Sequence, residues 1–492
     1  MSYLYTEIFI AIIPDVLILL TAFTVLGVDY GVMQKKDRRV RSALVSRISV
    51  SGLLFAVAVL ITQFAYCEGI DIELSGGQIV LNPLSFFFKI VIYLLAIPVV
   101  IFMKDNIVCE HVSEHYAMIL LSVIGAGILA MTQHLLIIFI AIELVSLCLY
   151  TLTAFRKESV EATEAAFKYF AIGGLASAFL LFGFSYLYGV TNTLNLSEIP
   201  MILDSVSSQK ELIFVSILFI IVGFGFKIAV VPFHLWAPDT YEWSSTPVTA
   251  WIAAGSKVGA VFVLTQILQP FLFHPDYLGM VITMLICLCV LSLLVGSFGA
   301  LKQTNVKRIL AYSAIAHGGY LLLGYISGSF DGMISALYYI IGYAIASVGV
   351  FGVISIMSDK LGRDATLADF KGCWKFSPLL GFLFLVFILS LAGIPPFAGF
   401  TSKMYLFYSV IKAGDGMHVG HLLVAFALCM SAVSLYYYIK ILKAFLVTNA
   451  DEAVVQIKGN FSENTVLVLL ALALLMLGIW PEPILGFLGT FL

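Results

Sequence analysis

The stretch FKIAVVPFH at residues 226–234 places a lysine and a proline break inside an apolar segment. The stretch IPPFAGFTSK at residues 394–403 repeats this combination, again inside an apolar run. A proline in a helix interior removes a hydrogen bond and kinks or breaks the helix. A lysine at the centre of a bilayer costs roughly 2.5–3.5 kcal/mol on insertion scales. The two stretches together therefore predict membrane helices that are interrupted at functional positions.

Apolar runs cover almost the whole chain, of which 61% is hydrophobic and 11% charged, with a mean hydropathy of +1.06. Runs of about 20 residues are long enough to cross the hydrocarbon core of a bilayer. Nothing between them is long enough for a soluble domain, which predicts an all-α polytopic membrane protein. We expect about 14 transmembrane helices, at residues 7–28, 45–66, 84–103, 116–131, 133–155, 162–189, 211–235, 246–269, 279–300, 307–326, 332–357, 376–412, 421–446 and 464–489.

The two breaks, at Pro232 and at Pro395-Pro396, fall in the seventh and twelfth of these spans. These two spans are five crossings apart along the chain. Because five is an odd number, the two broken helices run in opposite directions. Spans 4–8 and 9–13 are then two inverted five-helix repeats, an architecture in which ion sites lie at discontinuous helices near the midplane. The predicted divisions are an N-terminal three-helix segment, the two repeats and a C-terminal helix, at residues 1–115, 116–272, 273–450 and 451–492.

The basic residues predict the orientation. The chain has 26 Lys and Arg residues, from which we set aside five intramembrane lysines: Lys89, Lys168, Lys227, Lys257 and Lys403. Of the other 21, we place 19 in or beside the loops that follow odd-numbered spans. By the positive-inside rule these loops are cytoplasmic, and both termini are extracytoplasmic.

One extracytoplasmic loop has the alternation of a small β-hairpin. Ile70, Ile72 and Leu74 alternate with polar residues, residues 75–77 supply a Ser-Gly-Gly turn, and an apolar triplet follows at residues 79–81.

Four ionisable residues lie deep in predicted spans: Glu143, Lys227, Lys257 and Lys403. The default interpretation of such residues is a pathway for ions or protons, and the alternative is a hydrogen-bonded structural group. Moving a carboxylate toward or away from a desolvated lysine changes its proton affinity. A line of such groups with water between them would therefore form a gated proton pathway.

Four further residues are ambiguous. Lys168 is either part of the pathway or a surface-leaning ion pair with Glu164, four residues earlier. Lys89 is only five residues from the start of its span, which favours snorkelling to the extracytoplasmic face. His317 is either a proton relay or a packed histidine. For His234, which follows the first break, the same two alternatives remain: a proton relay or a packed histidine.

Cofactor motifs are lacking. The seven cysteines show no spacing typical of a metal or iron–sulfur site. There is no strand–GxGxxG–helix unit and no P-loop, so we expect no flavin, nucleotide or metal on this chain. Only isolated carboxylates are present, whereas a specific sodium site would call for clustered oxygen ligands.

Three long motifs, in order along the chain, resemble the antiporter-like membrane subunits of respiratory complex I. They are KIAVVPFHLWAPDTYE at residues 227–242 with TPVTA at 246–250, KRILAYS at 307–313 with AHGGY at 316–320, and AGIPPFAGF at 392–400 with SK at 402–403. The resemblance implies 14 helices, two inverted repeats and one proton channel. It implies that Glu143 and Lys227 form the controlling pair, and that Lys257 and Lys403 continue the path.

The resemblance also implies a place within the family. The chain resembles the N-type subunits of the family in two features: a lysine at position 403 and an end at residue 492. M-type, K-type and J-type membrane subunits are then the expected neighbours, and NADH, FMN, iron–sulfur clusters and quinone are expected in other subunits. Three alternatives stay open: a subunit of a multisubunit cation/proton antiporter, the membrane arm of an energy-converting hydrogenase, and an inert scaffold.

Overall fold

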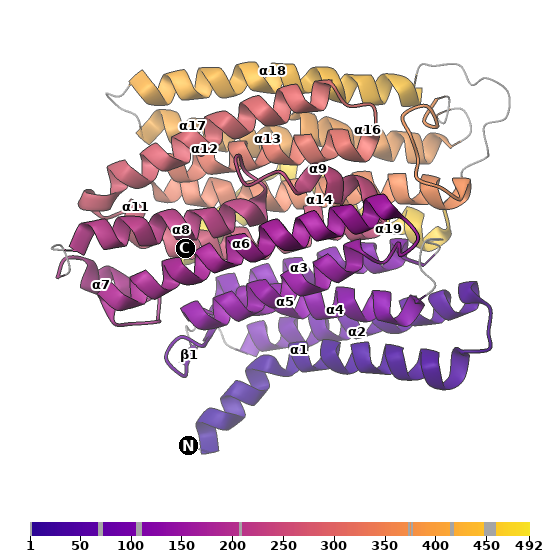
Figure 1. Ribbon diagram of the computed structural model, residues 1–492, viewed down its shortest axis with the longest axis horizontal. Coiled ribbons are helices and arrows are strands. Elements are labelled where there is room, and N and C mark those ends of the chain that lie inside the picture. The colour runs from indigo at the N-terminus through magenta and orange to yellow at the C-terminus, as the bar shows by residue number, and fades with distance from the viewer. Residues whose placement is uncertain are drawn as a thin grey trace.

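The computed structural model describes residues 2–66, 72–104, 111–205, 209–371, 374, 377–413, 418–446 and 459–492. Within them the chain forms a bundle of long helices that lie side by side, with α1 and α2 at one edge and α18 at the other (Figure 1). Thirteen helices of the described part are long and apolar enough to cross a membrane. Two shorter helices, α16 (Pro378–Ala392) and α17 (Ala398–Ala413), together form the predicted broken span. The prediction of about 14 spans with a break in the twelfth is therefore confirmed.

The remaining elements follow the predicted order. The first three spans are α1 (Ser2–Val28) with its π-helical end η1 (Asp29–Met33), α2 (Arg38–Tyr66) and α3 (Pro83–Phe102). The first repeat comprises α4 (Val112–Leu129), α5 (Leu135–Thr153), α6 (Val160–Thr191), the short α7 (Ile199–Leu203), α8 (Lys210–Ile228), α9 (Ala237–Trp243), α10 (Thr246–Ala253) and α11 (Gly255–Leu272). The second comprises α12 (Pro275–Leu301), α13 (Val306–Ile326), α14 (Phe330–Leu361), α16, α17 and α18 (His418–Leu446), and α19 (Phe461–Ile479) and α20 (Glu482–Phe491) end the chain.

The hairpin prediction is confirmed where the structure describes it. Strands β1 (Ile72–Leu74) and β2 (Ile79–Leu81) pair antiparallel, while Ile70 lies outside the described residues. The hairpin is anchored to the bundle because the Val80 amide donates to the Met131 carbonyl at 2.8 Å.

The centre of the bundle is built from three spans: α10 with α11, α13, and α14. They are buried along almost their whole length, whereas α1, α6 and α12 each expose one side. Small residues allow the helices to pack closely against one another. A Cβ on Gly296 of α12 would lie 2.5 Å from the Ala316 backbone nitrogen of α13. The division into domains stays a prediction, and its last boundary, at residue 450, lies outside the described residues.

Candidate functional site

The first break ends α8 directly after Lys227. Ile228 is the last helical residue, and Ala229 adopts a left-handed conformation with φ of 63°. The predicted span 211–235 is therefore too long, because the helix stops three residues before Val231-Pro232. The free backbone groups are satisfied inside the protein: the Val230 amide donates to Gly225 O at 2.9 Å, and the Trp236 indole donates to Phe226 O at 3.1 Å. Buried partners of this kind make an interrupted helix tolerable at membrane depth.

Lys227 contacts the helix that carries Glu143, through Ser146. The Lys227 ammonium donates to Ser146 Oγ, one turn along α5 from Glu143. Among the described residues Lys227 forms no direct ion pair with Glu143, although the two groups interact electrostatically. Glu143 Oε1 is buried and has no hydrogen-bond partner within the described part of the chain. A buried carboxylate oxygen without a partner is costly, so this carboxyl is suited to exchange a proton or a partner.

Close helix contacts enclose the pair. A Cβ on Gly173 of α6 would lie 1.9 Å from the Tyr150 hydroxyl, which is on the same face of α5 as Glu143. A Cβ on Gly223 would lie 2.7 Å from Leu180 of α6. The glycines near Lys227 therefore let α6 pack directly over the site.

The span that carries Lys257 is itself interrupted, which the sequence analysis missed. Helix α10 ends at Ala253, and α11 begins at Gly255, less than one turn before the lysine. Lys257 is 3% exposed. No hydrogen bond of its ammonium is found among the described residues, and its nitrogen lies 5.5 Å from the centre of the Tyr343 ring. The Ala-Ala-Gly-Ser run at residues 253–256 was the available signal.

A small cavity of about 10 Å³ joins Lys257 to His317. This is about the space that one water needs. Its walls come from α8, α11, α13 and α14, namely Ile228, Lys257, Ala314, His317, Gly318, Leu321, Tyr339, Ile340 and Tyr343. The structure thus brings the end of the first broken helix, Lys257 and His317 to one place.

His317 is both packed and hydrogen-bonded. Its Nδ1 lies 2.5 Å from the Tyr339 hydroxyl, and its Nε2 lies 3.0 Å from the Tyr438 hydroxyl. A neutral imidazole has one donor and one acceptor nitrogen, so one tyrosine accepts and the other donates. His317 also interacts electrostatically with both Lys257 and Lys403. The histidine is therefore near both lysines, and it lines a cavity together with Lys257.

Lys403 lies at the second break. Its ammonium donates to Ala392 O at 3.2 Å, to Ser431 Oγ at 3.4 Å and to Leu391 O at 3.5 Å. Ala392 is the last residue of α16, so the cation occupies the negative end of a helix dipole. The turn requires Gly393, because its φ is 82° and a Cβ there would lie 2.9 Å from the Lys403 side chain. The nitrogen also lies 4.7 Å from the centre of the Tyr320 ring.

Among the described residues, neither Lys168 nor His234 shares a hydrogen bond, an ion pair or a cavity with Lys227, Lys257, His317 or Lys403. Lys168 is 42% exposed on its side chain and pairs with Glu164 at 2.7 Å and with Asp239 at 2.8 Å. Arg308 also binds Asp239, at 2.8 Å. The surface-leaning ion pair is thus present, with Asp239 as a second partner that the sequence analysis did not name. His234 is partly buried, and its Nδ1 lacks a hydrogen-bond partner within the described residues.

The prediction that Lys89 snorkels to the surface is wrong. Lys89 is fully buried and pairs with Asp15 of α1, with 2.5 Å between Nζ and Oδ2. The Tyr93 hydroxyl donates to the other oxygen of Asp15 at 2.6 Å. A counter-charge inside the bundle removes the need to reach water. Asp15 was missed, although a carboxylate in the middle of the first apolar run was a visible signal.

No group of three or more His, Cys, Asp or Glu side chains that could hold a metal ion occurs in the described part of the chain.

Comparisons with known proteins agree over most of the length. The family model described as NADH:quinone oxidoreductase/Mrp antiporter, TM, matches residues 132–431. The NADH-quinone oxidoreductase subunit N 2 of Acidobacterium capsulatum is 37% identical, over 96% of this chain and 97% of the relative. The NADH-quinone oxidoreductase subunit N of Methylovorus glucosotrophus is 35% identical, over 96% of this chain and 95% of the relative.

Three solved structures have a similar fold. A chain of respiratory complex I from Thermus thermophilus is 30% identical with a TM-score of 0.79, covering 96% of this chain and 99% of that one. A chain of the archaeal membrane-bound sulfane sulfur reductase is 25% identical with a TM-score of 0.86, covering 98% and 97%. A chain of the Mrp complex from Dietzia sp. is 21% identical with a TM-score of 0.81, covering 98% and 96%, and shows the fold alone.

Proposed function

The chain belongs to the family of membrane subunits shared by NADH:quinone oxidoreductases and Mrp antiporters, and on this premise we propose that it is the N-type proton-translocating subunit of a respiratory complex I. The fold does not separate the functions within the family, since its likeness to chains of three different complexes is about equal. Sequence identity favours complex I. Relatives named subunit N of NADH-quinone oxidoreductase match at 31–37% over nearly the whole chain.

The observation that carries the proposal is a series of buried and partly buried polar groups through the centre of the bundle. Lys227 donates to Ser146, one helix turn from Glu143. Ile228, the residue after Lys227, lines the small cavity that Lys257 also lines. His317 lines that cavity with Lys257 and also interacts electrostatically with Lys403. A desolvated lysine held by neutral hydroxyls, carbonyls and rings gains or loses a proton as its neighbours' charges change. We propose that protons move along this series, with Lys168 and His234 as outlying members.

According to this proposal, the redox reaction takes place in other subunits of the assembly. NADH, FMN, iron–sulfur clusters and quinone would be held by other subunits, and the present chain would convert their reaction into proton movement. M-type, K-type and J-type membrane subunits would be its neighbours. The chain would lie in a bacterial inner membrane, with the loops after odd-numbered spans on the cytoplasmic side.

A Lys227→Ala variant tests the pathway. We expect it to assemble normally but to move far fewer protons per NADH oxidised, because the link between the Glu143 region and the Lys257 cavity is lost. The matched control is Lys412→Ala, since Lys412 is exposed and pairs with Asp331 at 2.6 Å, away from the series. Proton uptake and NADH oxidation are measured together in vesicles with quantified complex. Undiminished pumping by Lys227→Ala would refute the proposed path.

The family alternatives need a different experiment. Extraction in mild detergent, followed by mass spectrometry of the co-purifying subunits, identifies the assembly. Flavin and iron–sulfur proteins with other antiporter-like subunits support complex I. A nickel subunit would identify a hydrogenase, and a set of membrane proteins alone would identify a secondary antiporter.

A further inference from the structure

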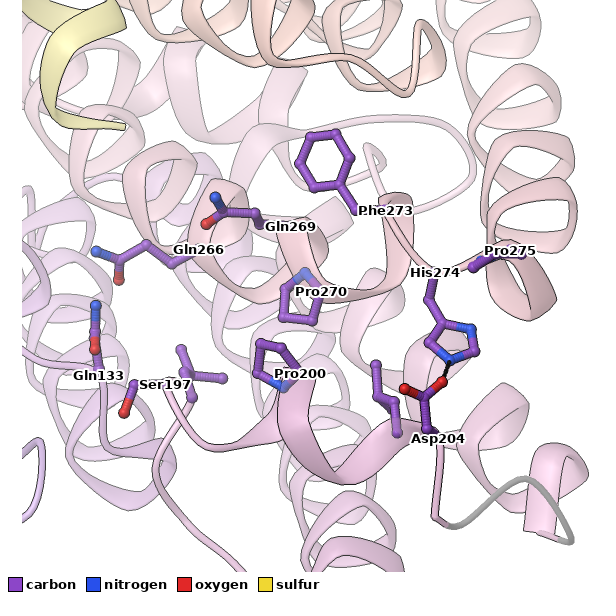
Figure 2. A pocket seen from close by; sticks show the side chains of 12 residues that line it. Gln133, Ser197, Pro200, Asp204, Gln266, Gln269, Pro270, Phe273, His274 and Pro275 are labelled. Atoms are coloured by element: carbon purple, nitrogen blue, oxygen red, sulfur yellow. Dashed lines mark hydrogen bonds and ion pairs between the residues drawn. The ribbon is translucent and has the colours of Figure 1, made fainter.

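A polar hollow of about 490 Å³ opens at the end of the bundle that carries the loops after even-numbered spans (Figure 2). It lies between the segments that follow α4, α6 and α11. We call it the glutamine vestibule, lined by Gln133, Leu196, Ser197, Pro200, Leu203, Asp204, Gln266, Gln269, Pro270, Phe273, His274 and Pro275. Figure 2 shows His274 and Asp204 joined at one side of it, with 3.1 Å between Nε2 and Oδ1.

The lining of the glutamine vestibule suits water rather than a lipid headgroup. It contains three side-chain amides and a hydroxyl but no lysine or arginine, whereas sites for anionic headgroups are basic. Its volume holds on the order of ten waters, each of which occupies about 30 Å³ in the liquid. Gln266 Oε1 is buried and has no hydrogen-bond partner among the described residues. A buried amide oxygen calls for a donor, and a water in the hollow supplies one.

A second polar contact lies on the membrane side of the vestibule. Thr265 Oγ1 and the Tyr325 hydroxyl are 2.8 Å apart and fully buried, and the Val261 carbonyl, an acceptor for both, lies 2.9 Å from the first and 3.3 Å from the second. Tyr325 is one turn along α13 from Leu321, which lines the cavity between Lys257 and His317. The Thr265–Tyr325 contact therefore lies between that cavity and the vestibule.

Helix geometry explains how this contact could join the two. With 3.6 residues per turn, Thr265 lies about 80° around α11 from Lys257, and Gln266 lies about 180° from it. Along the axis, Lys257 and Thr265 are about 12 Å apart. Gln266 thus lies on the opposite face of α11 from Lys257. Thr265 lies on the helix surface between these two faces, so it can connect a polar group on one face with a polar group on the other.

We propose that the glutamine vestibule is a water-filled opening of the proton pathway on the face of the even-numbered loops, reached from Lys257 and His317 through Tyr325 and Thr265. This inference rests on the proposed function. The vestibule would be an exit for protons in the first repeat. The series of polar groups described under the proposed function continues instead to Lys403 in the second repeat.

The first test asks whether water reaches Gln266. Gln266→Cys and Gln269→Cys are labelled with a charged, membrane-impermeant thiol reagent added outside spheroplasts, and the parent chain gives the background of native cysteines. The control is Leu268→Cys, at the same depth but fully buried. We expect both glutamine positions to react at least about tenfold faster than position 268, because the reactive thiolate requires water. Equal rates at 266 and 268, or labelling only from inverted vesicles, would overturn the proposal.

The second test asks whether protons use the opening. Tyr325→Phe and Gln266→Leu should each lower protons moved per NADH oxidised several-fold in assembled complex. The matched control is Tyr338→Phe, a buried tyrosine whose hydroxyl donates to Leu477 O outside this route. If both variants pump fully while Lys227→Ala does not, the vestibule is not an exit. If all three pump fully, the proposed function itself is wrong.

Discussion

The buried pair between Asp15 and Lys89 gives a prediction whose size follows from the structure. The Lys89 side chain is fully buried and that of Asp15 is 12% exposed. Apart from Asp15, the ammonium has only the Met131 sulfur within hydrogen-bonding distance among the described residues. Lys89→Met would leave the carboxylate with one donor, Tyr93, and Asp15→Asn would leave a buried cation without a counter-charge.

The expected magnitude is large for a single substitution. Removing one partner of a buried ion pair costs about 3–5 kcal/mol, whereas replacing both partners with neutral groups is close to neutral. At about 2.1 cal/mol/K of unfolding entropy per residue, a chain of 492 residues loses about 1 °C in Tm per kcal/mol. Each single variant should therefore lower Tm by about 3–5 °C, and the Asp15→Asn, Lys89→Met double variant by about 1 °C or less.

The assay is the thermal unfolding of four versions of the chain in detergent-solubilised membranes, each with a fluorescent reporter. The control is Lys412→Met, which removes the exposed pair between Lys412 and Asp331. Such a pair should contribute about 0–1 kcal/mol to the free energy of unfolding. Proton pumping by the double variant is measured in parallel. The reasoning fails if the single variants match the control, or if the double variant loses the sum of the two single effects. Loss of pumping in a stable double variant would place the pair in the proton pathway rather than in the scaffold.

Two further substitutions probe the packing and the charged end of the bundle. Burial would raise the pKa of the Asp364 carboxyl, but Lys307 and Arg156 outweigh it and lower the pKa to about 2, so Asp364→Asn should cost about 1–3 kcal/mol. The Tm difference from wild type should be constant above about pH 4 and shrink between about pH 4 and 2; a loss already at pH 6 would contradict this. Gly296→Ala should cost about 1–3 kcal/mol, because its Cβ meets the α13 backbone. The control Gly279→Ala has no atom within 4 Å of its Cβ, and equal Tm values would refute the argument.

The spans and their breaks were predictable because each depends on local sequence. Length and hydropathy determine whether a segment can cross a bilayer, and a proline interrupts a helix through its own backbone. The end of α8 was misplaced because the helix closes with Ala229 in a left-handed conformation, which glycine adopts far more readily than alanine. The interruption at Ala254 has no proline, so only a weak run of small residues marked it.

The partners of the buried charges were harder to predict. Hydropathy shows that a lysine in a span is costly, but it does not show what compensates it. Lys89 is paired with a residue 74 positions earlier, and Lys227 with a serine 81 positions earlier. Such pairs depend on how helices pack across the bundle. The prediction for Lys89 used its depth in the span alone, which is why it failed.

The two breaks share a backbone design but not the position of the charge. When Pro232-Phe233 is aligned with Pro396-Phe397, Asp239 corresponds to Lys403 and Lys227 corresponds to Leu391. In the first repeat the lysine precedes the break and reaches across to α5, and the position after the break is an acid bound by two cations. In the second repeat the lysine follows the break and turns back onto the free carbonyls of α16. What the repeats have in common is thus a helix end at depth. Only in the second repeat does the lysine bind the free carbonyls of that end; in the first, the Val230 amide and the Trp236 indole bind them and the lysine binds a neighbouring helix instead.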